Sequence, residues 1–241
     1  MLEIIDLSVS IDNKILLENI NIKIPQGENH ILFGPNGSGK TSLLMSIIGF
    51  PQYKVISGKI IFNGNDITNL SIDERARLGI GIVYQNPPGI KGLMLNNFVN
   101  KLEEKYGTKL YSYVDKLKMN ELIDRELNIN FSGGEKKKSE ILQILTQNPD
   151  FIMLDEPEAG VDVENINLIG NILKEFLDRK KIKNRKKSSF IITHTGYILD
   201  YLSADKGYIL INGKIVCEGN PYRIFELIKE KGFKECQLCK L

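Results

Sequence analysis

The sequence predicts an α/β fold in which a parallel-sheet core carries an antiparallel β subdomain and an inserted α-helical subdomain. Residues 29–50 read as a short apolar strand, a glycine-rich turn and a helix, the order that opens an α/β unit. Residues 151–154 and 188–194 are apolar runs typical of parallel strands that are buried on both faces. Residues 86 to about 130 contain helical stretches and no strong strand pattern, which indicates a helical insertion.

Turn signals divide the N-terminal half into short elements. Residues 2–11 and 15–24 favour two paired strands, closed by a turn at residues 25–27. The helix after the glycine-rich turn has its apolar side chains at helical spacing and ends at Gly49. A further strand is expected at residues 58–62, where an Asn-Gly turn follows, and another at 79–85.

The whole chain of 241 residues is expected to form one domain. Residues 1–85 and 150–220 are expected to build the core together with its β subdomain. The segment from about 86 to 149 is expected to be the helical subdomain, and residues 221–241 a C-terminal helical tail. A two-residue Asn-Gly turn near the end predicts a hairpin over residues 208–216.

Composition excludes several classes of protein. The chain has 32 Lys and Arg against 30 Asp and Glu, a formal net charge of +2, which gives no support to a nucleic-acid partner. No run approaches the roughly 18–20 apolar residues that cross a bilayer, and the first ten residues lack the features of an export signal. With three cysteines a disulfide scaffold is not expected. We expect a cytoplasmic protein that binds no nucleic acid and does not insert directly into a membrane.

The glycine-rich turn has the sequence GPNGSGKT at residues 34–41. Glycines allow the backbone to curl so that successive N–H groups point at phosphate oxygens, and the helix that follows adds the partial positive charge of its N-terminus. Lys40 is expected to reach the β- and γ-phosphates, and the Thr41 hydroxyl to ligate Mg²⁺. The strand–loop–helix context favours this phosphate-binding interpretation over a chance match.

Two carboxylates follow the apolar run 151–154 directly. A strand that ends beside a nucleotide presents Asp155 to Mg²⁺, and Glu156 is then placed to polarise the attacking water as a general base. An exposed strand end with acidic residues for solubility is the alternative. The upstream phosphate loop and the turn at Pro157 favour the catalytic interpretation.

A third signal is the segment FSGGE at residues 131–135. Ser132 and Glu135 have the spacing of a capping box, which predicts a helix that begins here and ends before Pro149. Two glycines in the first turn lower helix stability and leave backbone amides uncovered. This arrangement makes sense where an anion docks at the helix N-terminus.

These motifs, with Gln85 and His194, follow one another in the order and at the spacing of ABC-type ATPases. The chain resembles that family from residue 1 to about 220. In the family, two subunits form a head-to-tail sandwich, and ATP on the phosphate loop of one subunit meets the Ser-Gly-Gly segment of the other. The resemblance therefore implies a P-loop NTPase fold of the ABC-ATPase type, a homodimer on ATP binding, and ATP and Mg²⁺ as cofactors.

Residue roles follow from this resemblance. The expected catalytic residues are Lys40, Gln85, Glu156 and His194, of which His194 senses the γ-phosphate. The expected Mg²⁺ ligands are Thr41, Gln85 and Asp155. Residues 158–162 resemble the segment through which the two sites communicate. The nucleotide is expected to contact Gly34, Pro35, Asn36, Gly37, Ser38, Gly39, Lys40, Thr41, Ser42 and Ile11, and across the interface Ser132, Gly133 and Gly134. Ile11 stands where many members carry an aromatic that stacks on adenine, so we expect weaker discrimination between ATP and GTP.

Four segments resemble more narrowly the SufC family, the ATPases of the SUF system: residues 84–93, 131–143, 155–166 and 192–202. This resemblance implies a partner that is a soluble SufB/SufD-like scaffold protein, deformed by ATP-driven closure during iron–sulfur cluster assembly. One alternative is the nucleotide-binding subunit of an ABC transporter, which shares every catalytic residue. Another is a non-hydrolysing nucleotide-gated clamp, against which the presence of Glu156 argues.

The cysteines and one basic run carry weaker signals. Cys236 and Cys239 form a Cys-x-x-Cys pair, which offers two ligands and cannot complete a tetrahedral zinc site. Reduced surface cysteines, a metal or cluster site shared with a partner, and a redox pair remain open for them. Cys217 is expected to pack inside a hairpin strand. Residues 180–187 are expected to be a solvated loop before a buried strand, with an anionic partner site as the alternative.

Overall fold

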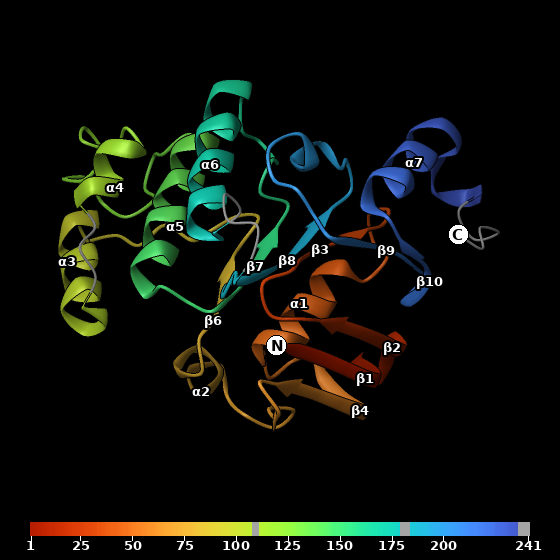
Figure 1. Ribbon diagram of the computed structural model, residues 1–241. Helices are drawn as coiled ribbons and strands as arrows, with labels where there is room; N and C mark the ends of the chain where they lie inside the picture. The colour runs from red at the N-terminus through yellow and green to blue at the C-terminus, as the bar shows by residue number, and fades with distance from the viewer. Residues whose placement is uncertain (108–110, 179–183, 236–241) are drawn as a thin grey trace.

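The computed structural model describes residues 1–107, 111–178 and 184–235, and its strands form two sheets (Figure 1). The antiparallel sheet has the order β2-β1-β4-β5 and the larger sheet the order β10-β9-β3-β8-β7-β6. The antiparallel strands are β1 (Leu2–Ile11), β2 (Lys14–Ile24), β4 (Lys54–Phe62) and β5 (Asn65–Asp66). The strands of the larger sheet are β3 (Asn29–Phe33), β6 (Ile80–Val83), β7 (Phe151–Asp155), β8 (Ser188–Thr193), β9 (Lys206–Ile211) and β10 (Lys214–Gly219).

The larger sheet is parallel except at one edge. Strands β3, β6, β7, β8 and β9 run in the same direction, and β10 pairs antiparallel with β9 through the expected hairpin turn at Asn212 and Gly213. All five parallel strands consequently present their carboxyl ends at the same edge of the sheet. The prediction of an α/β fold with a parallel core and a separate antiparallel sheet is confirmed.

Successive residues of the parallel strands face opposite sides, so the sheet separates two apolar cores. Ile152 and Leu154 of β7 belong to the core on one face, and Phe151 and Met153 to the core on the other. The second core also contains the inner faces of β1, β2 and β4 and the helix α1 (Lys40–Ile48). This burial on both faces explains why the strands read as continuous apolar runs in the sequence.

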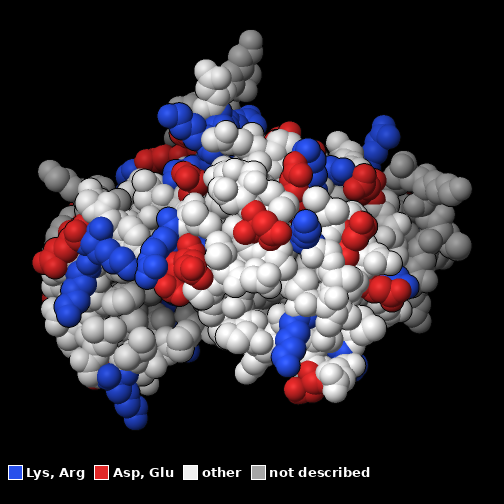
Figure 2. Space-filling view, turned by 90° about the horizontal axis from the view of Figure 1, so that it is seen from below, with Lys and Arg blue, Asp and Glu red and all other residues white. Residues whose placement is uncertain are grey.

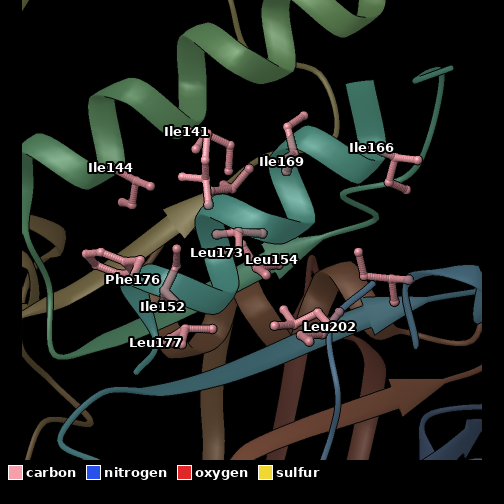
Figure 3. Close-up of a cluster of buried hydrophobic side chains, with 14 of the residues drawn as sticks. Ile141, Ile144, Ile152, Leu154, Ile166, Ile169, Leu173, Phe176, Leu177 and Leu202 are labelled. Atoms are coloured by element: carbon pink, nitrogen blue, oxygen red, sulfur yellow. The ribbon is translucent and has the colours of Figure 1, made fainter. Parts of the chain in front are cut away.

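Helices cover the remaining face of the parallel sheet (Figure 1). Figure 3 shows side chains of α5 and α6, such as Ile141 and Leu173, in one apolar cluster with Ile152 and Leu154 of β7. The helices after α1 are α2 (Ile72–Arg77), α3 (Leu95–Tyr106), α4 (Tyr111–Lys116), α5 (Gly133–Gln147), α6 (Val163–Phe176), the 3₁₀ turn η1 (Tyr197–Asp200) and α7 (Pro221–Glu235). None of the helices in the described ranges is long and apolar enough to cross a membrane.

Charges of both signs are interspersed on the face shown in Figure 2, in keeping with the near-neutral net charge. The basic segment before β8 differs in part from a solvated loop. Lys187 is half-buried, donates to the carbonyl oxygen of Pro149 at 2.6 Å and lies 4.2 Å from the centre of the Phe176 ring. Residues 180–183 and the pair Cys236 and Cys239 lie outside the described residues, whereas Cys217 is buried in β10.

Candidate functional site

The loop between β3 and α1 has a backbone that only glycine accepts at several positions. Gly37 and Gly39 have φ angles of 78° and 106°, in the left-handed region. A Cβ atom at Gly34 would lie 2.5 Å from the carbonyl oxygen of Leu210. The loop therefore packs closely against β9 before α1 begins, and at the start of α1 free backbone N–H groups and the helix dipole favour an anion.

Two polar side chains of this loop are buried within it. The Lys40 ammonium donates to the carbonyl oxygens of Gly34 at 2.8 Å and Pro35 at 3.1 Å. Burial lowers the pKa of Lys40, while the charges of Glu156 and Asp155 oppose that shift. Within the described part of the chain, the buried Ser38 hydroxyl has no hydrogen-bond partner. Such an unsatisfied group is the kind that a bound oxyanion stabilises.

Glu156 lies at the centre of the polar cluster beyond the carboxyl ends of the parallel strands. Its Oε2 accepts a hydrogen bond from Gln85 Nε2 at 2.7 Å, and its Oε1 lies 2.9 Å from His194 Nδ1. Gln85 follows β6, Glu156 follows β7 and His194 follows β8. The three side chains meet because their strands are neighbours in the sheet and end at the same edge. The carboxylate is thereby held between an amide and an imidazole.

Asp155, the last residue of β7, is buried with 3% of its surface exposed. Burial and the neighbouring Glu156 raise the pKa of Asp155 to about 6, against the opposing positive charges of Lys137 and Lys40. A buried carboxylate beside a second carboxylate is stabilised by a cation, and oxygen ligands of this kind suit Mg²⁺. The donor set of Asp155 and the Thr41 hydroxyl therefore fits a magnesium ion.

A cavity of about 400 Å³ connects the glycine-rich loop with the carboxylate cluster. Its lining residues are Leu16, Asn36, Gly37, Gly39, Lys40, Thr41, Ser42, Gln85, Glu156 and His194. Six of the thirteen residues expected to contact the nucleotide therefore line one space, and Gln85, Glu156 and His194 line it with them. Among the described residues, Leu16 of β2 supplies an apolar wall that the sequence interpretation missed, and Ile11 is not part of the lining.

The Ser-Gly-Gly segment lies at the N-terminus of α5, outside this lining. Ser132 caps the helix: its hydroxyl accepts from the Glu135 N–H at 3.3 Å, and the Glu135 carboxylate accepts from the Ser132 N–H at 2.7 Å. The expected capping box is confirmed. Ser132 and Gly133 are exposed, whereas Gly134 is buried against Asn165. A Cβ atom at Gly133 would lie 2.4 Å from the carbonyl oxygen of Gly160, so two backbone segments touch there.

Sequence interpretation also missed a buried charged pair on α5. Lys137 and Glu140 are 1% and 6% exposed, and their charged groups lie 3.6 Å apart. Lys137 donates to the carbonyl oxygen of Tyr84, and Glu140 accepts from the Tyr84 N–H at 2.5 Å. Burial raises the pKa of Glu140 to about 7. The pair thus fixes the main chain beside Gln85; its sequence signal is two charges at a spacing of three on the helix face that packs inward.

Comparison with known proteins gives one consistent family. Residues 17–159 match the family model described as ABC transporter. The chain is 38% identical to the probable ATP-dependent transporter ycf16 of Cyanidium caldarium, over 97% of this chain and 95% of that protein. It is 35% identical to a probable ABC transporter ATP-binding protein of Streptococcus pyogenes, over 95% of this chain and 93% of that protein. It is 33% identical to the probable ATP-dependent transporter SufC of Escherichia coli strain K12, over 97% of each.

Solved structures share the same architecture. A nucleotide-free ATP-binding cassette of an ABC transporter aligns with a TM-score of 0.79 at 28% identity, covering 100% of this chain and 99% of that chain. An ATP-binding cassette in its ADP conformation aligns with a TM-score of 0.77 at 27% identity, covering 100% of this chain and 99% of that chain. A dimeric cassette in a post-hydrolysis state, bound to ADP and Pi, has the same fold at a TM-score of 0.75 and 23% identity, covering 92% of this chain and 99% of that chain.

Proposed function

Because the chain belongs to the ABC transporter ATPase family, we propose that it is a SufC-like ATPase that drives conformational change in a soluble scaffold during iron–sulfur cluster assembly. The proposal has three parts: hydrolysis of ATP at the cavity beside Glu156, closure of two subunits around the nucleotide, and a partner of the SUF type. Different observations support each part.

The observation that best supports an ATP site is that four of the expected catalytic residues line one cavity: Lys40, Gln85, Glu156 and His194. The triphosphate would lie along the glycine-rich loop, where backbone N–H groups and the Lys40 ammonium neutralise its charge. Leu16 would contact the base as an apolar surface, which discriminates weakly between purines.

Magnesium fits the oxygen donors beside this loop. Thr41, Asp155 and Gln85 are the residues that would hold it. A bound Mg²⁺ neutralises charge that develops on the β- and γ-phosphates. Asp155 is then kept ionised by the added positive charge, although burial alone raises its pKa.

Glu156 is the group that would accept a proton from the attacking water. Its carboxylate already receives a hydrogen bond from Gln85 and contacts the His194 ring, so its orientation is set before the substrate arrives. His194 is 39% exposed on its side chain and can reach the γ-phosphate from the open side of the cavity. We assign it the sensing of that phosphate.

The exposed N-terminus of α5 supports a composite site between two subunits. The N–H of Gly133, in the exposed first turn of α5, has no acceptor within the helix, and the exposed Ser132 hydroxyl lies beside it, although among the described residues neither residue is part of the lining of the cavity of its own chain. In a head-to-tail homodimer these groups would meet the γ-phosphate held by the other subunit. We therefore propose that ATP joins the two copies.

The assignment of a scaffold partner rests on the SUF-type segments and on a groove beside Gln85. The groove has a volume of about 330 Å³, and apolar side chains of the helical insertion and the core dominate its lining, among them Pro87, Ile90 and Phe98. It lies where residues 84–93 resemble the SufC family. An apolar groove at the boundary of two subdomains suits a partner that responds to their relative movement.

A second candidate is the nucleotide-binding subunit of an ABC transporter. Relatives at 35% identity carry the name of an ABC transporter ATP-binding protein, and the catalytic residues are the same for both functions. The two candidates differ in what occupies the groove: a soluble scaffold in the first, a membrane permease in the second.

A pull-down from native cytosol and from detergent-extracted membranes, each with and without a non-hydrolysable ATP analogue, separates these candidates. The proposal expects a soluble SufB/SufD-like protein, with capture lost in Ile90→Asp and kept in Ile56→Asp, a matched change of an isoleucine that is 52% exposed on β4. Capture of an integral permease, with no soluble scaffold in either fraction, would establish the transporter role instead.

A further inference from the structure

The turn that carries His194 is closed by the side chain of the residue before it. The Thr193 hydroxyl oxygen accepts hydrogen bonds from the N–H of Thr195 at 3.1 Å and of Gly196 at 2.9 Å. Thr193 is fully buried at the end of β8. The backbone on either side of His194 is therefore folded around one hydroxyl group.

That hydroxyl is held in turn by Glu158, which lies on the segment after β7. Oε1 of Glu158 accepts a hydrogen bond from the Thr193 hydroxyl and a second from the Thr195 hydroxyl, the latter at 2.8 Å. Both threonines adjacent to His194 thus donate to a single carboxylate oxygen. Hydrogen bonds to an ionised acceptor are shorter and stronger than those to a neutral one.

The same segment holds His194 at a second point. Oε1 of Glu156 lies 2.9 Å from Nδ1 of the imidazole, and Glu158 is two residues further along the chain. One short segment therefore fixes both the ring of His194, through Glu156, and the backbone beneath it, through Glu158. In the described part of the chain, Oε2 of Glu158 is buried and accepts no hydrogen bond. The contacts of Glu158 with the two threonines thus use one oxygen, and the amide oxygen of a glutamine would accept both hydrogen bonds.

We propose that Glu158 is a positioning residue, which holds the His194 turn through Thr193 and Thr195 and so determines where the imidazole meets Glu156. The inference rests on the proposed role of His194 at the γ-phosphate. It assigns to Glu158 a task that the catalytic residues do not perform, since its carboxylate is engaged with the threonines.

A kinetic experiment on the full chain tests this coupling. Glu158→Ala is expected to lower kcat for ATP about 10-fold, a modest part of what a positioned acid–base group contributes, while the Kd for Mg-ATP changes less than about 2-fold. Thr195→Val is expected to act in the same direction, and Glu158→Gln, which keeps a carbonyl acceptor, to retain most of the activity. Glu164→Ala, on an exposed side chain of α6, is the matched control.

The decisive comparison is made in a His194→Ala background. If Glu158 acts through His194, Glu158→Ala lowers kcat no further once the imidazole is absent. A loss in this background as large as the loss in the parent overturns the proposal, as does unchanged kcat in Glu158→Ala when the parent hydrolyses ATP.

A measurement without turnover keeps the inference separate from the proposed function. The chain has two histidines, and His30 is a built-in reference, buried at the opposite end of β3 between Glu28 and Tyr208. Imidazole ¹⁵N–¹H spectra of Glu158→Ala should show shifted ring signals for His194 and unchanged signals for His30. Unchanged His194 signals reject the role of Glu158 whatever the ATPase assay shows. A parent without turnover, with the expected shift, would count against the proposed function alone.

Discussion

Glu156 has a φ angle of 45°, in the left-handed region that a non-glycine residue enters only at a cost. Its N–H still donates to the carbonyl oxygen of Ile192 in β8, at 3.0 Å, as a strand residue would. The positive φ angle then turns the chain out of the sheet directly after this residue. The strained bend carries the carboxylate to Gln85 and His194. Backbone strain is therefore found at the residue to which we assign the proton transfer.

Glu156→Gln keeps the shape of the side chain and removes its basicity. We expect turnover of ATP to fall by roughly 100-fold or more, the scale of a lost general base, with Mg-ATP binding retained and ATP-bound dimers accumulating. Steady-state hydrolysis and gel filtration with ATP measure the two effects. Lys40→Ala serves as the contrast, because it should lose nucleotide binding as well. Unchanged turnover in Glu156→Gln would remove this residue from the mechanism.

Glu140 makes the stability of the protein depend on pH. Its pKa is about 7 in the folded protein against an ordinary 4.5, because burial disfavours the charged form. The folded state therefore binds this proton more tightly than the unfolded state. Protonated Glu140 therefore contributes to the free energy of unfolding. This contribution is fully present below pH 4.5 and is lost as the pH rises to about 7.

Glu140→Gln keeps an acceptor for the Tyr84 N–H and removes the titration. The Tm of the variant minus that of the parent should therefore rise between pH 4.5 and 7, by at least about 2 °C, and stay level above that range. Thermal unfolding at a series of pH values measures it. Glu164→Gln, at an exposed site, should give a flat difference. A flat difference for Glu140→Gln too would mean that this carboxyl keeps an ordinary pKa.

At the level of the element, α1 is held at both ends by other parts of the chain. The loop before its start packs against β9, and Arg75 of α2 donates to the carbonyl oxygens of Ser46 and Ile47 at its last turn, at 2.7 and 2.8 Å. Arg75 is 2% exposed, and burial lowers its pKa to about 10. The helix whose N-terminus we assign to the phosphates is thus anchored at the opposite end as well.

The C-terminal helix α7 packs on the turn beside His194. Gly196 has a φ angle of 76°, and a Cβ atom there would lie 2.5 Å from the Phe225 ring. We expect Gly196→Ala to lower the free energy of unfolding by about 2–4 kcal/mol, through the left-handed backbone and the overlap with the ring, and to lower kcat.

In the double variant with Phe225→Ala, the overlap is relieved, so the total loss should be smaller than the sum of the single losses by at least about 1 kcal/mol. Chemical denaturation of the four proteins measures the coupling. Strict additivity would show that α7 does not constrain this turn.

Elements with a local chemical signature were predictable from the sequence, and contacts between distant segments were not. The glycine-rich loop, the capping box at Ser132 and the Asn-Gly hairpin each follow from a few adjacent residues. The helix α2 also has such a signal, a capping box of Ser71 and Glu74, which the sequence interpretation missed. Leu16 is at least 20 positions away in the sequence from the other residues that line the cavity, and Glu158 is more than 20 positions from Thr193. Only the folded sheets bring these residues together.

At the level of the whole molecule, the composite site predicts complementation between two inactive variants. Ser132→Asp keeps a good N-cap and adds a negative charge that would repel the phosphate of the other subunit, whereas Ser132→Asn keeps the cap without the charge. Ser132→Asp and Lys40→Ala should each be inactive as homodimers.

When the two variants are mixed, a heterodimer has one site in which both halves are intact, so activity should return to about a quarter of the parent value. ATP hydrolysis against mixing ratio is the measurement, and Ser132→Asn should remain active alone. If the mixture stays inactive while each variant folds, the two halves of the site do not come from different subunits.

The contact of Gly133 with the carbonyl oxygen of Gly160 has a mechanical consequence for such a pair. Main chain rests on main chain there, with no side chain between them to absorb a displacement. In the proposed homodimer, a movement of the Ser132–Gly133 segment against the other subunit's nucleotide would therefore also shift the segment after β7 that bears Glu156. If two copies share their sites as proposed, nucleotide binding at one site and hydrolysis at the other are therefore expected to be mechanically coupled.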